Sequence, residues 1–339
     1  MKRFIFFRND RLGDFIIITN LLKSIKKKYP NSKITLVSSF YNHRFIKKYK
    51  IIDRVILYNK DLNFVKKISI FKQIIKDEYY ASFFIDGKSF SNFCNIFIKS
   101  KYKLGLFYRY KFFLLSLLKP NYFYTFFFDK YETFTSKKFL DKIEHLPSKF
   151  IKLGNYLNLN IKKKDSYYFS NPINLLKTKY KNIFKEKFIL LHLDEKWLDI
   201  EDINEELYSN LCKFQKKIKK KLVITSHKNN FNYYIKLKKE LKKNKNKKII
   251  LLENTSLEIM EKLIKYSSYA ISCHSGFLVQ ISGANNSKII DIINKKDFKW
   301  YSCWIPKNTI HKFVFKSNEK IKFKLEKILF DIFNKIKKL

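Results

Sequence analysis

The sequence predicts an α/β fold built as two successive units, each a parallel sheet covered by helices on both faces. Three observations support this. The 339 residues, 46% of them hydrophobic, exceed the usual length of one domain and suit two. Short apolar runs alternate with stretches of helical periodicity, a pattern typical of βαβ units. The alternation is interrupted once, at a polar stretch that contains Pro172. We therefore expect two Rossmann-like domains.

Each half of the chain is expected to contain five strands. After the first strand, FIIITNLLKSIKKKY has apolar residues at three- and four-residue spacing, which predicts a helix before the second strand. The expected strands of the first half are residues 4–7, 33–38, 54–57, 81–86 and 102–106. Those of the second half are residues 188–193, 222–225, 248–252, 269–272 and 289–293.

These elements define the expected domain limits. Residues 1–159 form the first domain, 160–184 the linker, and 185–317 the second domain. A lysine-rich segment at residues 318–339 is expected to close the chain as a helix. In parallel sheets of this kind, ligands bind beyond the carboxyl ends of the strands.

The composition is strongly basic, with a formal net charge of +43. Arginine is rare among the 72 basic residues, being present only as Arg3, Arg8, Arg11, Arg44, Arg54 and Arg109. Nucleic-acid surfaces commonly use arginine forks on bases and phosphates, so we do not expect a nucleic-acid partner. A lysine-rich surface still attracts anionic partners such as nucleotides or phospholipid.

Cysteines and carboxylates give no sign of a metal or disulfide framework. The four cysteines are far apart, which fits a reducing cytoplasm. The acidic residues Asp199, Glu201, Asp202, Glu205 and Glu206 precede a helix, where negative charge interacts favourably with the helix dipole. A metal site there is the weaker alternative. The opening MKRFIFF resembles a first strand more than an export signal.

The most apolar region, residues 104–128, is too interrupted by charge and proline to span a membrane. Its aromatic and apolar side chains beside Arg109, Lys111 and Lys119 suit an anionic interface. One expectation is therefore peripheral association with the inner face of the cytoplasmic membrane. The alternative is a core helix and loop of the first domain.

Two sequence positions place charged groups at strand ends. In RLGDFIIIT, Gly13 is expected to allow a tight turn and Asp14 to stand at the carboxyl edge of the first sheet. An aspartate there also suits a helix N-cap. In the second half, Lys196 follows a strand, as do Ser275 and Gly276, whose N–H groups would face an anion at a helix start. A solvated lysine and a simple serine cap are the alternatives.

Four segments stand in register. They are residues 4–39, with Leu-Gly-Asp, Thr and Tyr-Pro; residues 79–106; residues 190–197, with Lys-Trp after a strand; and residues 254–292, with Ser-Gly after a strand. Together they resemble glycosyltransferase family 9, the heptosyltransferase-like enzymes, and the last segment is similar to the closing donor-site signature of that family. The resemblance implies a GT-B architecture, in which an acceptor domain and a nucleotide-sugar domain face a central cleft. It also implies inverting transfer without a bound metal.

The resemblance also assigns roles to residues. Asp14 becomes the catalytic base, with Arg11, Gly13 and Thr19 on the acceptor side. The donor contacts are Lys196, Trp197, His274, Ser275 and Gly276. No cofactor is implied: the co-substrate is a nucleotide-diphosphate sugar, ADP-heptose being one candidate, and the acceptor is a lipid-linked saccharide of lipopolysaccharide or another surface glycan.

The donor signature departs from the family pattern at two positions. The family usually has Asp before the Ser/Thr-Gly pair and His three residues after the glycine, where this chain has His274 and Val279. A non-catalytic nucleotide-sugar- or glycan-binding relative is therefore the alternative to an enzyme. A Rossmann-type oxidoreductase is disfavoured because the first strand is not followed by Gly-x-Gly-x-x-Gly.

Overall fold

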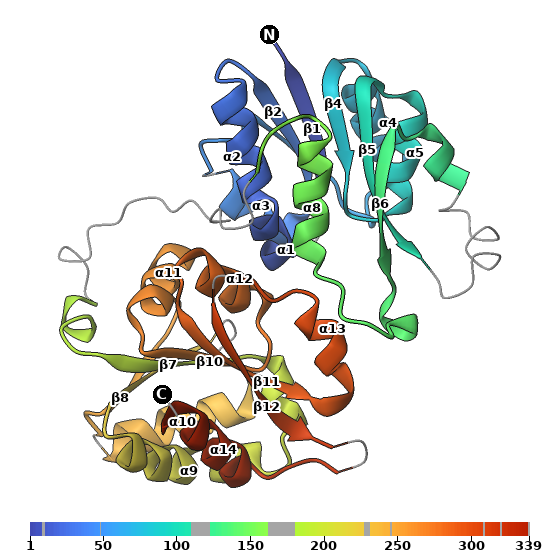
Figure 1. Cartoon of the computed structure of the whole chain (residues 1–339). Helices are drawn as coiled ribbons and strands as arrows, with labels where there is room; N and C mark the ends of the chain where they lie inside the picture. The colour runs from blue at the N-terminus through green and yellow to red at the C-terminus, as the bar shows by residue number, and fades with distance from the viewer. Residues whose placement is uncertain are drawn as a thin grey trace. The chain divides into compact units, whose positions relative to one another are not determined.

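The computed structural model describes the chain except for residues 9–10, 48, 110–122, 162–179, 227–230, 245, 308, 319–320 and 338–339. The chain divides into two compact units (Figure 1). Unit 1 consists of Met1–Phe169 and Ser302–Trp304, and unit 2 of Ser170–Tyr301 and Ile305–Leu339. The main division falls inside the expected linker, most of which lies outside the described residues.

Unit 1 is built on a six-stranded parallel sheet with the order β3-β2-β1-β4-β5-β6. The strands are β1 (Arg3–Arg8), β2 (Lys33–Ser38), β3 (Arg54–Leu57), β4 (Glu78–Phe84), β5 (Lys99–Arg109) and β6 (Lys130–Thr135). The central strand β1 pairs with β2 and β4, and its residues Phe4–Phe7 are fully buried. Such apolar runs are expected of a strand covered on both faces.

Helices cover both faces of this sheet. They are α1 (Leu12–Ile17), α2 (Thr19–Lys28), α3 (Phe40–Ile46), α4 (Phe64–Ile75), α5 (Ser89–Phe97) and α8 (Leu146–Asn155), with the 3₁₀ turns η1 (Tyr124–Phe127) and η2 (Lys137–Phe139). Ile74 of α4 and Cys94 of α5 share a buried cluster with Ile5 and Phe7 of β1. The helix expected after β1 is divided into α1 and α2 at Ile18.

Unit 2 repeats the arrangement with the order β12-β11-β10-β7-β8-β9, again all parallel. Its strands are β7 (Phe188–Leu193), β8 (Lys221–Ser226), β9 (Ile249–Leu252), β10 (Tyr269–Ser272), β11 (Lys288–Asn294) and β12 (Ile310–Ser317). Every residue of β7 and β10 is buried.

The helices of unit 2 are α9 (Ile203–Ile218), α10 (Asn232–Asn244), α11 (Leu257–Tyr266), α12 (Gly276–Ala284), α13 (Phe298–Ser302) and α14 (Leu325–Lys337). The 3₁₀ turns are η4 (Lys181–Ile183), η5 (Glu195–Asp199) and η6 (Lys295–Asp297). The last helix begins at Leu325 rather than near residue 318, because Ser317 and Lys322 first form an antiparallel bridge. Asp202 then accepts the N–H of Leu325 at 2.7 Å and so caps α14.

Two strands, β6 and β12, were not expected from the sequence. Both lie at an edge of their sheet. Their burial patterns contain few buried positions, so neither has the continuous buried run of a central strand. In the described part of the chain, no helix is long and apolar enough to cross a membrane.

The strand order creates one reversal in each sheet. In unit 1 the chain leaves β1 toward β2 on one side and returns to β4 on the other, and in unit 2 the same holds for β7, β8 and β10. Ligands of open α/β sheets bind at this reversal, beyond the carboxyl ends of the two central strands.

A glycine sets the packing of α12, the helix that follows β10. A Cβ at Gly283 would overlap the ring of Pro306. We predict that Gly283→Ala lowers the free energy of unfolding by about 1–3 kcal/mol, as is typical of overpacking. Thermal and urea unfolding measure the change.

Ser282→Ala is the matched control in the same helix. The buried hydroxyl of Ser282 has no hydrogen-bond partner among the described residues, so its removal is expected to leave stability unchanged or higher. Equal losses in the two variants would contradict the packing argument.

Candidate active site

In unit 1, Arg8 organises the carboxyl edge at the strand reversal. It ends β1, and its side chain is almost fully buried. Its Nη1 donates to the carbonyl oxygen of Ile85, just after β4, at 2.6 Å, and its Nε donates to the carbonyl oxygen of Asp14 at 3.1 Å. Arg8 therefore ties the two central strands to the start of α1.

The carboxylate of Asp14 forms an ion pair with the same guanidinium group. Its Oδ1 is 3.3 Å from Nη2 of Arg8, and its side chain keeps 27% of its surface exposed. The other oxygen, Oδ2, accepts the N–H of Arg11 at 3.3 Å. Asp14 is the third residue of α1 and Arg11 is the N-cap, so the carboxylate supports the helix start from inside the first turn. It is both held in place and partly open to solvent.

The neighbouring predicted residues are placed differently from expectation. Gly13 lies in the first turn of α1, so the tight turn expected at this glycine is the beginning of a helix. Thr19 is fully buried and donates its hydroxyl to the carbonyl oxygen of Ile16 at 2.7 Å, which joins α2 to α1. Arg11 is exposed at the N-cap. Asp14 and Arg8 are thus the charged pair at this edge, and Thr19 is part of the helix junction.

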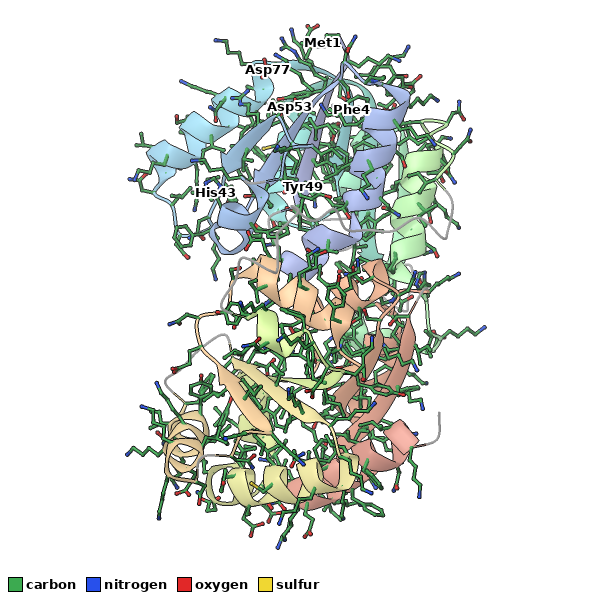
Figure 2. The ribbon with its side chains drawn as sticks, turned by 90° about the vertical axis from the view of Figure 1, so that its left-hand side faces the viewer. Met1, Phe4, His43, Tyr49, Asp53 and Asp77 are labelled. Atoms are coloured by element: carbon green, nitrogen blue, oxygen red, sulfur yellow. The ribbon has the colours of Figure 1, made fainter. Side chains whose placement is uncertain are left out.

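Three further ion pairs of unit 1 lie at the opposite edge. Arg3 and Arg54 both contact Asp77, each at 2.8 Å, and Lys26 contacts Asp53 at 2.8 Å. Figure 2 shows Asp53 and Asp77 near Met1, at the end of the sheet where the strands begin. These carboxylates fasten strand starts and are remote from the carboxyl edge.

In unit 2, Lys196 bridges the two central strands at their carboxyl ends. It lies in η5, directly after β7, and its Nζ donates to the carbonyl oxygen of His274, which follows β10, at 2.6 Å. The ammonium has three donors, and this carbonyl is its acceptor among the described residues. Lys196 is therefore fixed at the strand reversal and keeps donors for oxygen atoms of a ligand.

Buried side chains hold η5 in place through hydrogen bonds to its backbone and to Asp199. Lys316, only 3% exposed, donates to the carbonyl oxygen of Lys196 at 2.6 Å and to the carboxylate of Asp199 at 2.7 Å. The carboxylate of Asp194 accepts the N–H of Lys196 at 3.1 Å. Burial raises the pKa of Asp194 to about 6, although the charge of Lys196 lowers it.

The expected ligand contact by Trp197 is not supported. Its side chain is fully buried in the core of unit 2, and its indole N–H donates to the carbonyl oxygen of His192 at 3.0 Å. The indole therefore fixes the turn after β7 from inside, and Lys196 presents the functional group. Val279 is likewise buried and belongs to the core.

The start of α12 lies beside Lys196. Ser275 is its N-cap residue, but its side chain makes no capping hydrogen bond, which removes the simple cap interpretation. The backbone N–H of Ser275 instead donates to the hydroxyl of Ser272 at 3.1 Å. Gly276 is exposed at the first helical position. The first N–H groups of a helix have no intrahelical acceptor, so this terminus suits an anionic ligand.

His274 is held by a buried carboxylate. Its Nδ1 lies 2.6 Å from Oδ2 of Asp291, a fully buried residue of β11, and His311 of β12 approaches the same oxygen at 3.4 Å through Nε2. The imidazole also stacks on Tyr301, with ring centroids 3.6 Å apart. His274 has a φ of +53°, a conformation that is uncommon for a residue with a side chain. The loop before α12 is thus held by three contacts of His274: its carbonyl with Lys196, its Nδ1 with Asp291 and its ring with Tyr301.

The electrostatics of this cluster favour an ionised Asp291. Burial by itself raises the pKa of a carboxyl, but the charge and hydrogen bond of His274, together with His311, lower the pKa of Asp291 to about 2. Because Asp291 binds Nδ1, the Nε2 edge of His274 is the one left for other contacts. A protonated His274 would then present a cation beside Lys196 and the start of α12.

Sequence reasoning missed Arg8, Asp291, His311 and Lys316. Two of them had a local signal: Arg8 directly follows the expected first strand, and Asp291 interrupts the apolar run IIDII. Their roles depend on neighbours far away in the chain, which a single sequence does not supply. Among the described residues no group of three or more His, Cys, Asp or Glu side chains is suited to hold a metal ion.

The Asp291 cluster predicts acid sensitivity. The pKa of Asp291 is lowered on folding, so its ionised form stabilises the protein above the ordinary carboxyl pKa, and this stability is lost as the pH falls through the folded-state pKa. Between about pH 4 and about pH 2, the wild type should lose about 2 kcal/mol more unfolding free energy than Asp291→Asn. Urea unfolding at a series of pH values measures this difference. The same dependence of unfolding free energy on pH in the two proteins would exclude it.

No family model and no curated protein matches the sequence. Solved structures do. A family 9 glycosyl transferase from Veillonella parvula superimposes with a TM-score of 0.65 at 14% identity, covering 93% of this chain and 86% of that chain. A heptosyltransferase of E. coli with ADP gives a TM-score of 0.63 at 14% identity, covering 99% and 98%.

A different class of enzyme has a similar structure. UDP-GlcNAc 2-epimerase from Neisseria meningitidis, bound to UDP-GlcNAc, gives a TM-score of 0.55 at 12% identity, covering 100% of this chain and 92% of that chain. At such identities the likeness establishes the fold and not the reaction. The chain has the α/β fold expected from its sequence, two Rossmann-like units of the GT-B class.

Proposed function

We propose that the protein is an inverting glycosyltransferase, which moves a sugar from a nucleotide-diphosphate donor to a saccharide acceptor. The observation that carries the proposal is the placement of charged groups at the strand reversal of each unit. Unit 2 has Lys196 and His274 there, and unit 1 has Asp14 on the guanidinium of Arg8. The first pair suits a diphosphate, and Asp14 suits a proton acceptor.

At the proposed site of the sugar donor, three kinds of hydrogen-bond donor lie together at the carboxyl end of β10. The Lys196 ammonium is bonded to the carbonyl of His274, the His274 ring is fixed by Asp291, and α12 begins two residues later. Together they would stabilise the negative charge that develops on the departing nucleoside diphosphate. This arrangement needs no metal ion, so transfer is expected to be independent of divalent cations.

On the acceptor side, Asp14 is proposed as the general base. It would take the proton of the acceptor hydroxyl as that oxygen attacks the anomeric carbon from the side opposite the diphosphate. A new carbon–oxygen bond forms, the bond from the anomeric carbon to the phosphate oxygen breaks, and the nucleoside diphosphate leaves with the electron pair. Arg8 holds Asp14 during this step and compensates its charge.

Structural neighbours support this class of substrate. They include heptosyltransferases with ADP and with ADP-2-deoxy-2-fluoro heptose, and an epimerase bound to UDP-GlcNAc. A nucleotide-diphosphate sugar is therefore proposed as the co-substrate, with ADP-heptose as the first candidate. The proposed acceptor is a lipid-linked saccharide of lipopolysaccharide or another surface glycan at the inner face of a membrane.

A binding protein without catalysis is the second candidate. It is favoured by Val279, which is buried where the family pattern has a histidine. An assay with ADP-heptose and UDP-sugars distinguishes the two functions. A transferase and a binding protein would both bind nucleotide, but only the transferase would release nucleoside diphosphate when an acceptor is present. Appearance of an epimerised UDP-sugar would instead indicate the reaction of the other neighbours.

Lys196→Ala should weaken nucleotide-diphosphate binding. Loss of one hydrogen bond to a charged group costs about 1.5–3 kcal/mol, or about a 10- to 150-fold rise in Kd. Isothermal titration with ADP, UDP and their sugars measures the change. Lys213→Ala, which removes an exposed lysine paired with Glu326 on α14, is the control and should bind normally. In the transfer assay, loss of activity on addition of a chelator and its recovery with Mg²⁺ would count against the metal-free arrangement.

Asp14→Asn should reduce transfer by at least about a hundredfold, because a carboxamide cannot take the acceptor proton. The amide oxygen can still accept the N–H of Arg11, so folding and nucleotide binding should persist. Asp53→Asn is the matched control at the opposite edge of the sheet and should transfer sugar normally. Near wild-type transfer by Asp14→Asn would show that the carboxylate serves the helix start only.

A further inference from the structure

Helix α4 carries three of its large apolar side chains on the outside of unit 1, while Ile70 and Phe71 pack against the buried core. Only Ile74 is buried, whereas Phe64 and Val65 are 75% and 73% exposed and Ile68 is 36% exposed. Phe64, Ile68 and Phe71 follow one another at four- and three-residue spacing, so they form one stripe along the helix. A helix that only covers a sheet turns such a stripe inward.

Helix α5 continues this apolar surface. The ring of Phe71 lies 5.4 Å from that of Phe93 and 5.5 Å from that of Phe97, measured between centroids. Phe93 and Phe97 are 44% and 50% exposed, and their own rings are 5.1 Å apart. Phe71 therefore links the stripe of α4 to the exposed rings of α5, and the two helices lie together in Figure 1.

The turn η1 extends the surface beyond α5. Asn95 of α5 donates to the carbonyl oxygen of Phe127 at 3.1 Å, which fixes the turn to the helix. Phe126 of this turn is 78% exposed, and Phe123 next to it is 58% exposed. Single exposed apolar residues are ordinary, but a connected group from three elements marks an interaction surface. We call the residues Phe64, Val65, Ile68, Phe93, Phe97 and Phe126 the aromatic face.

Within the three elements that carry the aromatic face, the charged side chains have one sign, and the exposed Asp61 and Asp129 lie beyond the ends of α4 and η1. Helices α4 and α5 and the turn η1 contain no acidic residue, while α4 carries the exposed Lys66 and Lys72 and is followed by Lys76. Asp77, which comes next, is neutralised by Arg3 and Arg54. The face is thus apolar with a positive margin.

This combination distinguishes a lipid surface from a protein partner. Protein interfaces are depleted of lysine, whereas helices that lie in a membrane interface combine aromatic side chains with lysines that reach the lipid headgroups. We propose that the aromatic face docks on a membrane that contains anionic lipids. This extends the membrane part of the proposed function to a defined surface, and it holds whether or not the protein transfers sugar.

Vesicle co-sedimentation of the full chain tests the proposal. The wild type should bind vesicles of phosphatidylcholine with phosphatidylglycerol, and bind pure phosphatidylcholine vesicles at least about tenfold more weakly. The double variant Phe64→Ser with Val65→Ser should lose at least about tenfold in affinity, since it withdraws two apolar side chains from the lipid. Phe330→Ser, on α14 of unit 2, is the matched control because Phe330 is also exposed, and it should bind like the wild type.

A second pair of changes tests the charged margin. Lys66→Gln with Lys72→Gln should weaken binding to the anionic vesicles by about fivefold for each lysine at low salt, and less at high salt. Unfolding temperatures and circular dichroism of all variants should match the wild type, because the altered positions are exposed.

Three results would overturn the proposal. The first is no binding of the wild type to anionic vesicles. The second is unchanged binding by the Phe64 and Val65 variant, which would place the lipid contact elsewhere. The third is self-association of the wild type without lipid, abolished in that variant, since the aromatic face would then join two copies of the chain. Sedimentation velocity measures this last property, and none of these measurements depends on transfer activity.

Discussion

A buried cation fastens the carboxyl edge of each sheet, and both candidate sites depend on it. In unit 1 this is Arg8, which binds the carbonyls of Ile85 and Asp14 and the Asp14 carboxylate. In unit 2 it is Lys316, which binds the carbonyl of Lys196 and the carboxylate of Asp199. A charge without a partner is too costly to bury, so each cation requires these oxygens to stay where they are. The groups proposed for chemistry are therefore held in place by charges that are almost fully buried.

The loop before α12 shows how a changed signature can still form a compact ionic site. His274 occupies the position where the family pattern has an aspartate, and the missing carboxylate is supplied from β11 by Asp291. The left-handed backbone of His274 costs free energy on the order of 1 kcal/mol, and the bond from Lys196, the ion pair and the Tyr301 stack oppose its relaxation. These contacts hold His274 in place, so an imidazole is the side chain that this loop offers to a ligand.

The sequence predicted the architecture more completely than the site. Buried strands such as β2, β7 and β10 were predicted at their observed limits, because an apolar run between turn residues is a local signal. The edge strands β6 and β12 lack this signal and were missed. Asp14, Lys196 and His274 were singled out from their place after strands and from the family resemblance, and their roles stay predictions. Trp197 and Thr19 proved to be buried. Their burial depends on packing against distant segments, which local sequence patterns do not encode.

The return of the chain to unit 1 affects how the protein can be divided. The residues Ser302–Trp304 belong to unit 1: the carbonyl of Cys303 accepts the N–H of Leu146 at 2.9 Å, and Trp304 contacts the ring of Phe134. Unit 1 is thus made of two separate pieces of sequence, and unit 2 is as well. A single cut in the linker leaves one half without part of its packing, so exchange of units between related proteins requires a second junction within residues 301–305. A chimera joined only at the linker would separate Trp304 from Phe134, the residue against which its ring packs.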